Sequence, residues 1–416
     1  MTETAEQQPT MQFEVIVVGG GMVGAALAML LGQAGVAVAL LDARPEPLDA
    51  DAVGKGLPAM RVSALTPVSQ RLLEGLGAWP WMAARRVTPY RYMQVWDSEG
   101  SGEVGFSAEQ AGVPMLGHIV ENDVVLAALE RGLAEVPTVS VRLGARVIGL
   151  HEGPAGREVM LDEGHRLSAP LVVAADGARS PLRELAGIGV SERDTGHVAV
   201  VTTVRTERDH GGVARQVFLA TGPLAFLPLT VAGDARYCSI VWSTTPREAE
   251  RLTALAPAAL GRELESAFEA RLGAVEVVDR ALAVPLTQRH AEHYVQPGFA
   301  LVGDAAHSIH PLAGQGVNLG LMDAAVLAEE LLAARRRGIA LGEPRMLERY
   351  ARRRRGDNAA MLALMDGFRL LFGTSHPAVT LLRNLGLSGV DRLTPVKRLL
   401  MQQAIGQRGT LPSSCR

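Results

Sequence analysis

The sequence predicts an α/β protein with a Rossmann-like domain, a second domain built on an antiparallel sheet, and a helical C-terminal region. Three observations predict this class. A strand–glycine loop–helix–strand pattern fills residues 13–42, two further buried strands each run into an Asp near residues 176 and 304, and β-rich segments follow one another through residues 190–286. Because such strand patterns stand toward both ends of the chain, we expect the Rossmann-like domain to be discontinuous.

The expected domain division follows from these patterns. Residues 1–12 form a flexible N-terminus, 13–189 and 287–340 form the Rossmann-like domain, 190–286 form the antiparallel-sheet domain, and 341–416 form the helical region. The 416 residues are enough for two domains, each with a sizeable core.

The composition is that of an ordinary globular protein. Hydrophobic residues make up 48% of the chain and charged residues 20%, and a net charge of -3 gives no reason to expect a nucleic-acid partner. The two cysteines, Cys238 and Cys415, form no disulfide framework and are typical of a reducing compartment. The N-terminus is polar and lacks the basic start of a signal peptide, which favours a cytoplasmic protein.

The first three elements come from the N-terminal pattern. Residues 13–18 are apolar and β-rich and predict a buried strand, residues 22–35 predict a helix ended by Gly35, and residues 36–42 predict the next strand. Residues 15–41 contain no charged side chain, which is long enough to suggest a membrane span. The glycines and the change of hydrophobic period inside the run favour a buried strand–turn–helix–strand unit instead.

A glycine fingerprint lies between the first strand and the helix. Gly19, Gly21 and Gly24 match G-x-G-x-x-G, in which the first glycine makes the turn, the second admits a pyrophosphate and the third packs helix on strand. Asp42 ends the next strand and is placed to bind an adenosine ribose. The alternative is a merely tight turn, but this context strongly favours a dinucleotide site. A second match at residues 100–105 precedes no helix and predicts a hairpin turn.

Two later strands end in similar turns. The run at 171–177 ends in Asp176-Gly177, with Ser180 as the expected N-cap of a following helix, and the run at 299–307 contains Gly303-Asp304. Each turn alone could be a plain strand end. Together with the glycine fingerprint, they predict three strand ends at one cofactor-binding edge. The fingerprint itself does not choose between NAD(P) and FAD.

The antiparallel-sheet domain is predicted from four β-rich segments with short, turn-rich gaps. They cover residues 197–207, 215–221, 225–233 and 237–245. After residue 318 the pattern is mostly helical.

Four motifs carry a resemblance to a known family: GGGMVG, RVSAL, VAADGARSPLR and GDAAHSIHPLAGQGVNLG. The chain resembles the single-component, FAD-dependent aromatic hydroxylases of the p-hydroxybenzoate hydroxylase class. Within that class it is similar to the UbiH/UbiF/UbiI family of ubiquinone-biosynthesis hydroxylases, and most of all to the 2-octaprenylphenol hydroxylase type. The likeness runs from Phe13 to about Gly406.

The resemblance implies a role for each matching residue. It implies that the fingerprint glycines hold the FAD pyrophosphate, that Asp42 binds the ribose although the family more often has Glu there, and that Asp304 binds the ribityl chain. No residue is identified as the catalytic proton donor or acceptor. The remaining positions implied to contact FAD are Arg61, Asp176, Gly177, Gly303, Pro311, Gly314, Gly316 and Asn318.

The resemblance also implies a reaction. NAD(P)H would reduce the flavin, O2 would form a flavin C4a-hydroperoxide, and a polyprenylated phenol would be hydroxylated in ubiquinone biosynthesis. Two alternatives remain open: the same chemistry on a small soluble phenol, and a flavin-binding scaffold in a biosynthetic complex. A polyprenylated substrate further implies peripheral membrane contact or partner proteins of the pathway, and an oligomer is compatible with the sequence.

Histidines and a basic run leave two questions open. Asp304, His307 and His310 fall at three-residue steps, as metal ligands might, but the pattern favours histidines that are structural, line the flavin or carry protons. Residues 352–355 are four consecutive arginines, which predict either a solvated helix face or a patch for anionic lipid or an acidic partner.

Overall fold

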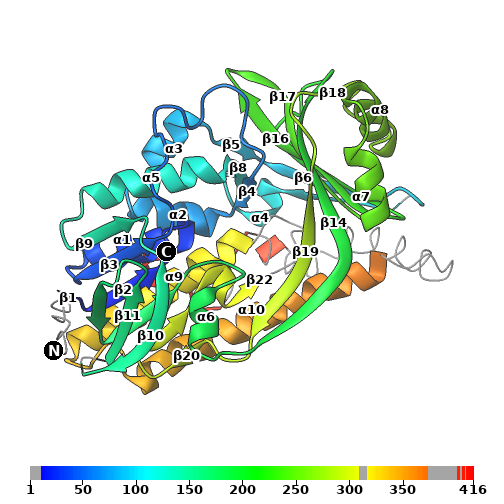
Figure 1. Cartoon of the computed structure of the whole chain (residues 1–416). Helices are drawn as coiled ribbons and strands as arrows, with labels where there is room; N and C mark the ends of the chain where they lie inside the picture. Colours follow the sequence, from blue (N-terminus) through cyan, green and yellow to red (C-terminus); the bar gives the residue numbers. More distant parts are fainter. Residues whose placement is uncertain are drawn as a thin grey trace.

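The computed structural model describes residues 11–100, 102–154, 156–308, 316–372, 401–402, 405–407 and 409–416, with residues 360–372 described through their backbone. Two large sheets lie side by side, and the long helix α10 (Pro344–Phe372) runs beneath both in the view of Figure 1. Parallel and antiparallel sheets with covering helices confirm the predicted α/β class.

The first large sheet is six-stranded and mostly parallel. Its order is β20-β21-β13-β2-β3-β9, and of its neighbouring pairs the edge pair β20–β21 is antiparallel. The strands are β2 (Val15–Val18), β3 (Val38–Asp42), β9 (Val139–Leu143), β13 (Leu171–Ala174), β20 (Val295–Gln296) and β21 (Phe299–Leu301). Every residue of β2, β13 and β21 is buried, as expected for parallel strands that are covered on both faces.

Helices cover this sheet and complete its core. α1 (Met22–Gln33) connects β2 to β3, so the charge-free run of residues 15–41 is a strand–helix–strand unit as predicted. α1 packs against α5 (Asn122–Ala134) and α9 (Gly316–Arg336), and α9 packs against α10. Among the described residues, no helix is both long and apolar enough to cross a membrane.

The second large sheet is nine-stranded and largely antiparallel, with the order β22-β19-β14-β17-β16-β15-β6-β7 and β18 beside β14. One face packs on α7 (Pro246–Thr253) and α8 (Pro257–Ala267) around Trp96, Phe226 and Phe268. Its strands are β6 (Tyr92–Asp97), β7 (Glu103–Ser107), β14 (Val190–Thr206), β15 (Val213–Leu219), β16 (Gly222–Val231), β17 (Asp234–Thr244), β18 (Val275–Val277), β19 (Leu282–Ala291) and β22 (His307–Ser308).

Three strands of this sheet come from outside residues 190–286. β6 and β7 pair antiparallel, as the hairpin prediction for residues 100–105 requires, and β6 then pairs in parallel with β15. β22 adds to the far edge beside β19. The nine-stranded sheet is thus built from more of the chain than residues 190–286 alone.

Two small sheets fill the remaining space. They consist of β4 (Val62–Leu65), β8 (Gly117–Glu121) and β5 (Thr88–Tyr90), and of β1 (Met11–Gln12), β12 (Arg166–Ala169), β11 (Gly156–Leu161) and β10 (Val147–Gly153). The short helices are α2 (Pro67–Gly75), α3 (Trp79–Arg85), α4 (Ala108–Ala111), α6 (Pro181–Leu185), η1 (Gly303–Ala305) and η2 (Ser413–Cys415). Cys238 and Cys415 are both free and buried.

Candidate cofactor site

The three predicted turns meet at one edge of the parallel sheet. β13 lies between β2 and β21, so the carboxyl ends of these strands are adjacent. The Ala175 amide donates to the Val18 carbonyl at 2.7 Å, and the Val302 amide donates to the Ala174 carbonyl at 3.0 Å. Residues 19–24, 175–177 and 303–304 therefore follow directly on neighbouring strands.

The three fingerprint glycines have different surroundings. A Cβ on Gly19, whose φ is +106°, would overlap the Ala175 carbonyl, and a Cβ on Gly24 would overlap the Gly19 carbonyl. At Gly21, the N-cap of α1, no atom of the described chain lies within 4 Å of a built Cβ. Gly19 and Gly24 thus close the turn, while Gly21 leaves open space in front of the helix N-terminus, as a bound pyrophosphate requires.

Asp42 holds the glycine loop at the neighbouring strand end. Its Oδ2 accepts from the Gly20 amide at 2.5 Å, and its Oδ1 accepts from the Arg44 amide at 2.7 Å and from Arg44 Nε at 3.2 Å. Arg44 also binds Glu130 at 2.9 Å, yet its buried Nη1 has no hydrogen-bond partner among the described residues. Sequence analysis missed Arg44, which contacts the predicted ribose-binding residue Asp42.

The turn after β13 carries a second unpaired polar atom. Oδ2 of Asp176 accepts from the Leu182 amide at 3.0 Å, whereas its buried Oδ1 has no partner within the described ranges. Burial raises the pKa of this carboxyl above its ordinary value. Gly177 follows with a φ of +90°, and Ser180 accepts from the Arg183 amide at 2.9 Å as the predicted N-cap of α6.

Arg183 ties the second turn to the third. Its side chain is 4% exposed, and Nη1 donates to the carbonyls of Ala178 at 3.2 Å and Ala305 at 3.0 Å. One buried cation therefore fixes the spacing between the Asp176 turn and η1, a role that sequence reasoning did not assign.

Asp304 lies in the third turn with its side chain open to solvent. Desolvation by the surrounding protein raises the pKa of its carboxyl, while the charges of His307 and Arg61 lower it. Arg61 is exposed and precedes β4, and its charge lies close enough to Asp304 to lower the pKa of that carboxyl. Gly303 has a φ of +60°, and a Cβ there would stand 3.2 Å from Val23 of α1.

The residues predicted to line the flavin ring are only partly visible. Pro311 and Gly314, with His310, lie outside the described residues. Gly316 begins α9, and no described atom lies within 4 Å of a built Cβ there. Asn318 is buried, and its amide side chain accepts from the Thr66 amide at 2.9 Å and donates to the Ala64 carbonyl at 2.8 Å. That side chain fixes the start of α9 against β4 and α2.

His307 is an internal hydrogen-bonding residue. It is 2% exposed, and its Nε2 lies 2.6 Å from Oδ2 of Asp323 on α9. In the described part of the chain, no group of three His, Cys, Asp or Glu side chains could hold a metal ion. Asp304 lies in η1 and His307 begins β22. The partner of His307 is Asp323, a residue that sequence analysis did not single out.

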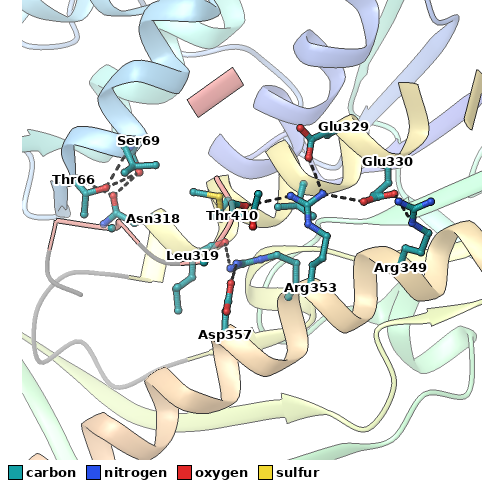
Figure 2. A pocket seen from close by; sticks show the side chains of 16 residues that line it. Thr66, Ser69, Asn318, Leu319, Glu329, Glu330, Arg349, Arg353, Asp357 and Thr410 are labelled. Carbon is teal, nitrogen blue, oxygen red and sulfur yellow. Dashed lines mark hydrogen bonds and ion pairs between the residues drawn. The ribbon is translucent and has the colours of Figure 1, made fainter. Parts of the chain in front are cut away.

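A cavity of about 490 Å³ lies between α2, α9, α10 and the described residues of the C-terminal tail (Figure 2). One end is formed by Thr66, Ser69 and Asn318. The other end is charged, because Arg353 binds Glu329 at 2.7 Å and Glu330 at 2.9 Å.

The arginine run is accordingly not a uniform basic surface. Arg353 is half-buried in these ion pairs, and Arg354 is only 2% exposed. Arg352 and Arg355 are the exposed members of the run.

The chain is similar to a family of FAD-binding domains, to ubiquinone-biosynthesis hydroxylases and to a solved monooxygenase structure. Residues 12–364 match the family model described as "FAD binding domain". The chain is 42% identical over 400 residues to the 3-demethoxyubiquinol 3-hydroxylase of Escherichia coli, covering 96% of this chain and 99% of that protein. It is 39% identical to the ubiquinone hydroxylase UbiL of Rhodospirillum rubrum, covering 94% and 89%. Among solved structures, p-nitrophenol 4-monooxygenase from Pseudomonas putida shares the fold, with a TM-score of 0.76, 23% identity, and coverage of 96% and 100%.

Proposed function

Because this chain belongs to the FAD-dependent ubiquinone-biosynthesis hydroxylases, we propose that it hydroxylates the ring of a polyprenylated phenol, using NAD(P)H and O2. The family makes it an FAD-dependent monooxygenase. The proposal adds the substrate, the reductant and the residues that hold the cofactor.

The observation that carries the proposal is the match to relatives over nearly their whole length. Both relatives named above have a ubiquinone-type ring in their names, one as a demethoxyubiquinol hydroxylase and one as a ubiquinone hydroxylase. A ring of this class with a polyprenyl tail is therefore the substrate that the relatives support best. The specific likeness to 2-octaprenylphenol hydroxylases remains a prediction from sequence.

The strand-end edge fits FAD in its shape and its unpaired atoms. Gly21 leaves room for a pyrophosphate at the N-terminus of α1, where backbone amides and the helix dipole favour an anion. The unpaired Nη1 of Arg44 and Oδ1 of Asp176 supply a donor and an acceptor for the cofactor. Asp304, exposed in the third turn, would accept hydrogen bonds from the ribityl hydroxyls.

Each part of the chain has a defined task in this proposal. Bound FAD would supply the redox chemistry by which two electrons come from NAD(P)H, one oxygen atom of O2 enters the phenol and the other leaves as water. The three turns orient the cofactor, with Arg183 holding the second and third turns at a fixed distance. The nine-stranded sheet, which stands beside the parallel sheet, would provide the surface on which an aromatic ring lies.

The test compares one phenol with and without its prenyl tail. Purified protein loaded with FAD is supplied with NADH or NADPH, and both cofactor oxidation and the hydroxylated product are measured. We expect the product only with the prenylated compound. Equal turnover of the tail-free phenol would instead indicate a small soluble substrate, and no product from either compound with FAD bound would indicate a scaffold.

A further inference from the structure

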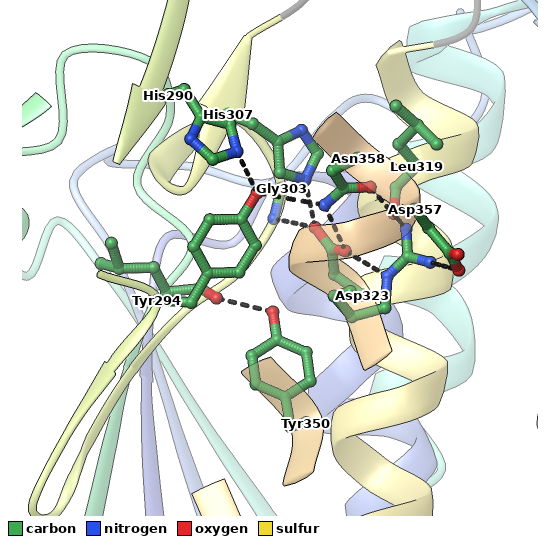
Figure 3. A network of polar contacts seen from close by, with 11 residues as sticks. His290, Tyr294, Gly303, His307, Leu319, Asp323, Tyr350, Asp357 and Asn358 are labelled. Carbon is green, nitrogen blue, oxygen red and sulfur yellow. Dashed lines mark hydrogen bonds and ion pairs between the residues drawn. The ribbon is translucent and has the colours of Figure 1, made fainter. Parts of the chain in front are cut away.

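A buried polar network lies directly behind the Gly303–Asp304 turn (Figure 3). Its centre is Asp323 of α9, which is fully buried. Oδ2 of Asp323 accepts from the Gly303 amide at 3.0 Å and lies 2.6 Å from His307 Nε2. The carboxylate thus contacts the backbone of the turn at Gly303 and the side chain of His307, which begins the following strand β22.

The other half of the network comes from the C-terminal helix. Arg354 Nε of α10 donates to Oδ1 of Asp323 at 2.6 Å, and Arg354 Nη2 donates to Asn358 Oδ1 at 2.8 Å. Asn358 Nδ2 lies 3.3 Å from Oδ1 of Asp323. Arg354 and Asn358 are 2% and 0% exposed, so these contacts form away from water, where charge-assisted hydrogen bonds are strong.

The neighbours of Asp323 keep its buried carboxylate ionised. The neighbouring His307 and Arg354 lower the pKa of Asp323 to about 2 against the opposing effect of burial. The carboxylate therefore stays ionised at neutral pH, and its two oxygens are shared between the turn and α10. A buried ion pair of this kind contributes little net stability, so its value lies in fixing one geometry.

We propose that Asp323, Arg354 and Asn358 are positioning residues that fix the Gly303–Asp304 turn in the orientation needed to bind the ribityl chain of FAD. The inference rests on the proposed placement of the ribityl chain at Asp304. It assigns α10 a part in cofactor binding, although Arg354 and Asn358 lie roughly 50 residues after the turn in sequence.

Among the described residues, one chain of contacts leads from the network to the half-buried His290, through Asn358 and the Tyr294 hydroxyl. Half-buried His290 lies 3.1 Å from the Tyr294 hydroxyl, and that hydroxyl accepts from Asn358 Nδ2 at 3.3 Å. An amide nitrogen donates a hydrogen bond but does not accept a proton. Asn358 therefore acts in this contact as a hydrogen-bond donor, which is compatible with a positioning role.

The experiment measures FAD affinity and the visible circular dichroism of bound flavin in three variants. Asp323→Asn removes the charge, and Asn358→Leu removes the amide while leaving the ion pair of Asp323 and Arg354. Tyr350→Phe is the matched control, because its hydroxyl donates from the same helix to the Leu301 carbonyl at 2.7 Å without touching Asp323. All three lose buried hydrogen bonds of α10 or its neighbour α9.

We expect the FAD dissociation constant to rise about ten-fold or more in Asp323→Asn and about three-fold or more in Asn358→Leu, with an altered flavin dichroism in both. Tyr350→Phe should lower the unfolding midpoint while leaving both flavin readouts as in the wild type. Should Asp323→Asn fail to fold, Asn358→Leu decides the matter.

Wild-type affinity and dichroism in Asn358→Leu, or equal losses in all three variants, would overturn the positioning role. Failure of the proposed cofactor placement gives a different result. In that case Asp304→Ala would leave FAD affinity unchanged, whatever the network variants do.

Discussion

At the scale of single residues, Gly21 is a glycine that the fold itself does not require, which suits the ligand-binding role proposed for it. Its backbone φ of −68° is open to any residue, and the space beside it is free of described protein atoms. At positions 19 and 24, in contrast, the fold requires glycine, because any side chain there would overlap backbone atoms.

Gly21→Val should therefore abolish FAD retention while changing the free energy of unfolding of the apoprotein by no more than about 0.5 kcal/mol. The valine side chain would occupy the space in front of the α1 N-terminus, where the FAD pyrophosphate is proposed to lie. Flavin absorbance after purification and urea unfolding of the apoprotein measure the two effects. Gly356→Ala, at another glycine with open space around it on α10, is the control and should keep its flavin. A yellow Gly21→Val protein would remove the fingerprint from the account.

His118 on β8 is a second residue whose properties follow from its surroundings, in this case through the effect of burial on its pKa. The ring is 7% exposed, packs edge-on against Trp79 at 5.0 Å, and its Nδ1 has no partner among the described residues. Burial lowers the pKa of His118 to about 4. Trp79 is thus a packing residue of α3 in this structure.

This pKa predicts a loss of stability in mild acid. The unfolded chain binds a proton at His118 near its ordinary pKa of about 6.5, whereas the folded chain does so only near 4, so folding weakens as pH falls through this window. The expected loss between pH 7 and pH 5 is about 2 kcal/mol. In His118→Phe this pH-dependent loss of stability should be absent. Urea unfolding of the variant and the wild type at both pH values measures the difference. An identical pH dependence in the variant and the wild type would contradict the burial of a neutral imidazole.

At the scale of elements, the cofactor edge depends on contacts between turns. Arg183 at the start of α6 is held by the N-cap geometry of Ser180 and reaches across to η1. Its two carbonyl contacts keep the Asp176 turn and the Asp304 turn together.

Arg183→Met keeps the length of the side chain but removes these contacts. We expect the free energy of unfolding to fall by about 1–3 kcal/mol, because two buried carbonyls lose their donor, and FAD to bind more weakly. Arg166→Met, which removes an exposed ion pair with Glu158, is the control and should change stability by no more than about 0.5 kcal/mol. Unchanged FAD affinity in Arg183→Met would show that the spacing of the turns does not depend on this side chain.

Local sequence patterns were enough to predict the elements that form the proposed cofactor site. β2, α1 and β3 follow from apolar runs and glycines, and the Ser180 cap follows from Ser-Pro, because both signals are local. The pairing of β6 with β15 could not be predicted, because alternation within a strand does not name its partner. Arg183 and Asp323 were missed for a related reason, since their partners lie far away in sequence and a buried charge has no periodic signature.

At the scale of the whole molecule, the two large sheets and α10 form one frame around the cofactor edge. The parallel sheet brings the three turns together, the nine-stranded sheet stands beside it, and α9 and α10 join the turn at Gly303 to the C-terminal part of the chain (Figure 1). The tail belongs to this frame as well, because Ser413 donates to Glu329 of α9 and Arg71 of α2 donates to the Cys415 carbonyl. Monooxygenation needs such a frame because cofactor and phenol must be held in one orientation.

Oxygen labelling tests the central claim most directly. The FAD-loaded protein is supplied with NAD(P)H, a prenylated phenol and oxygen-18 gas, and the product is analysed by mass spectrometry. The account predicts a hydroxylated prenylphenol that carries one oxygen-18 atom, formed only when FAD is bound. Oxidation of NAD(P)H with FAD bound, but without label in any prenylated product, would contradict it.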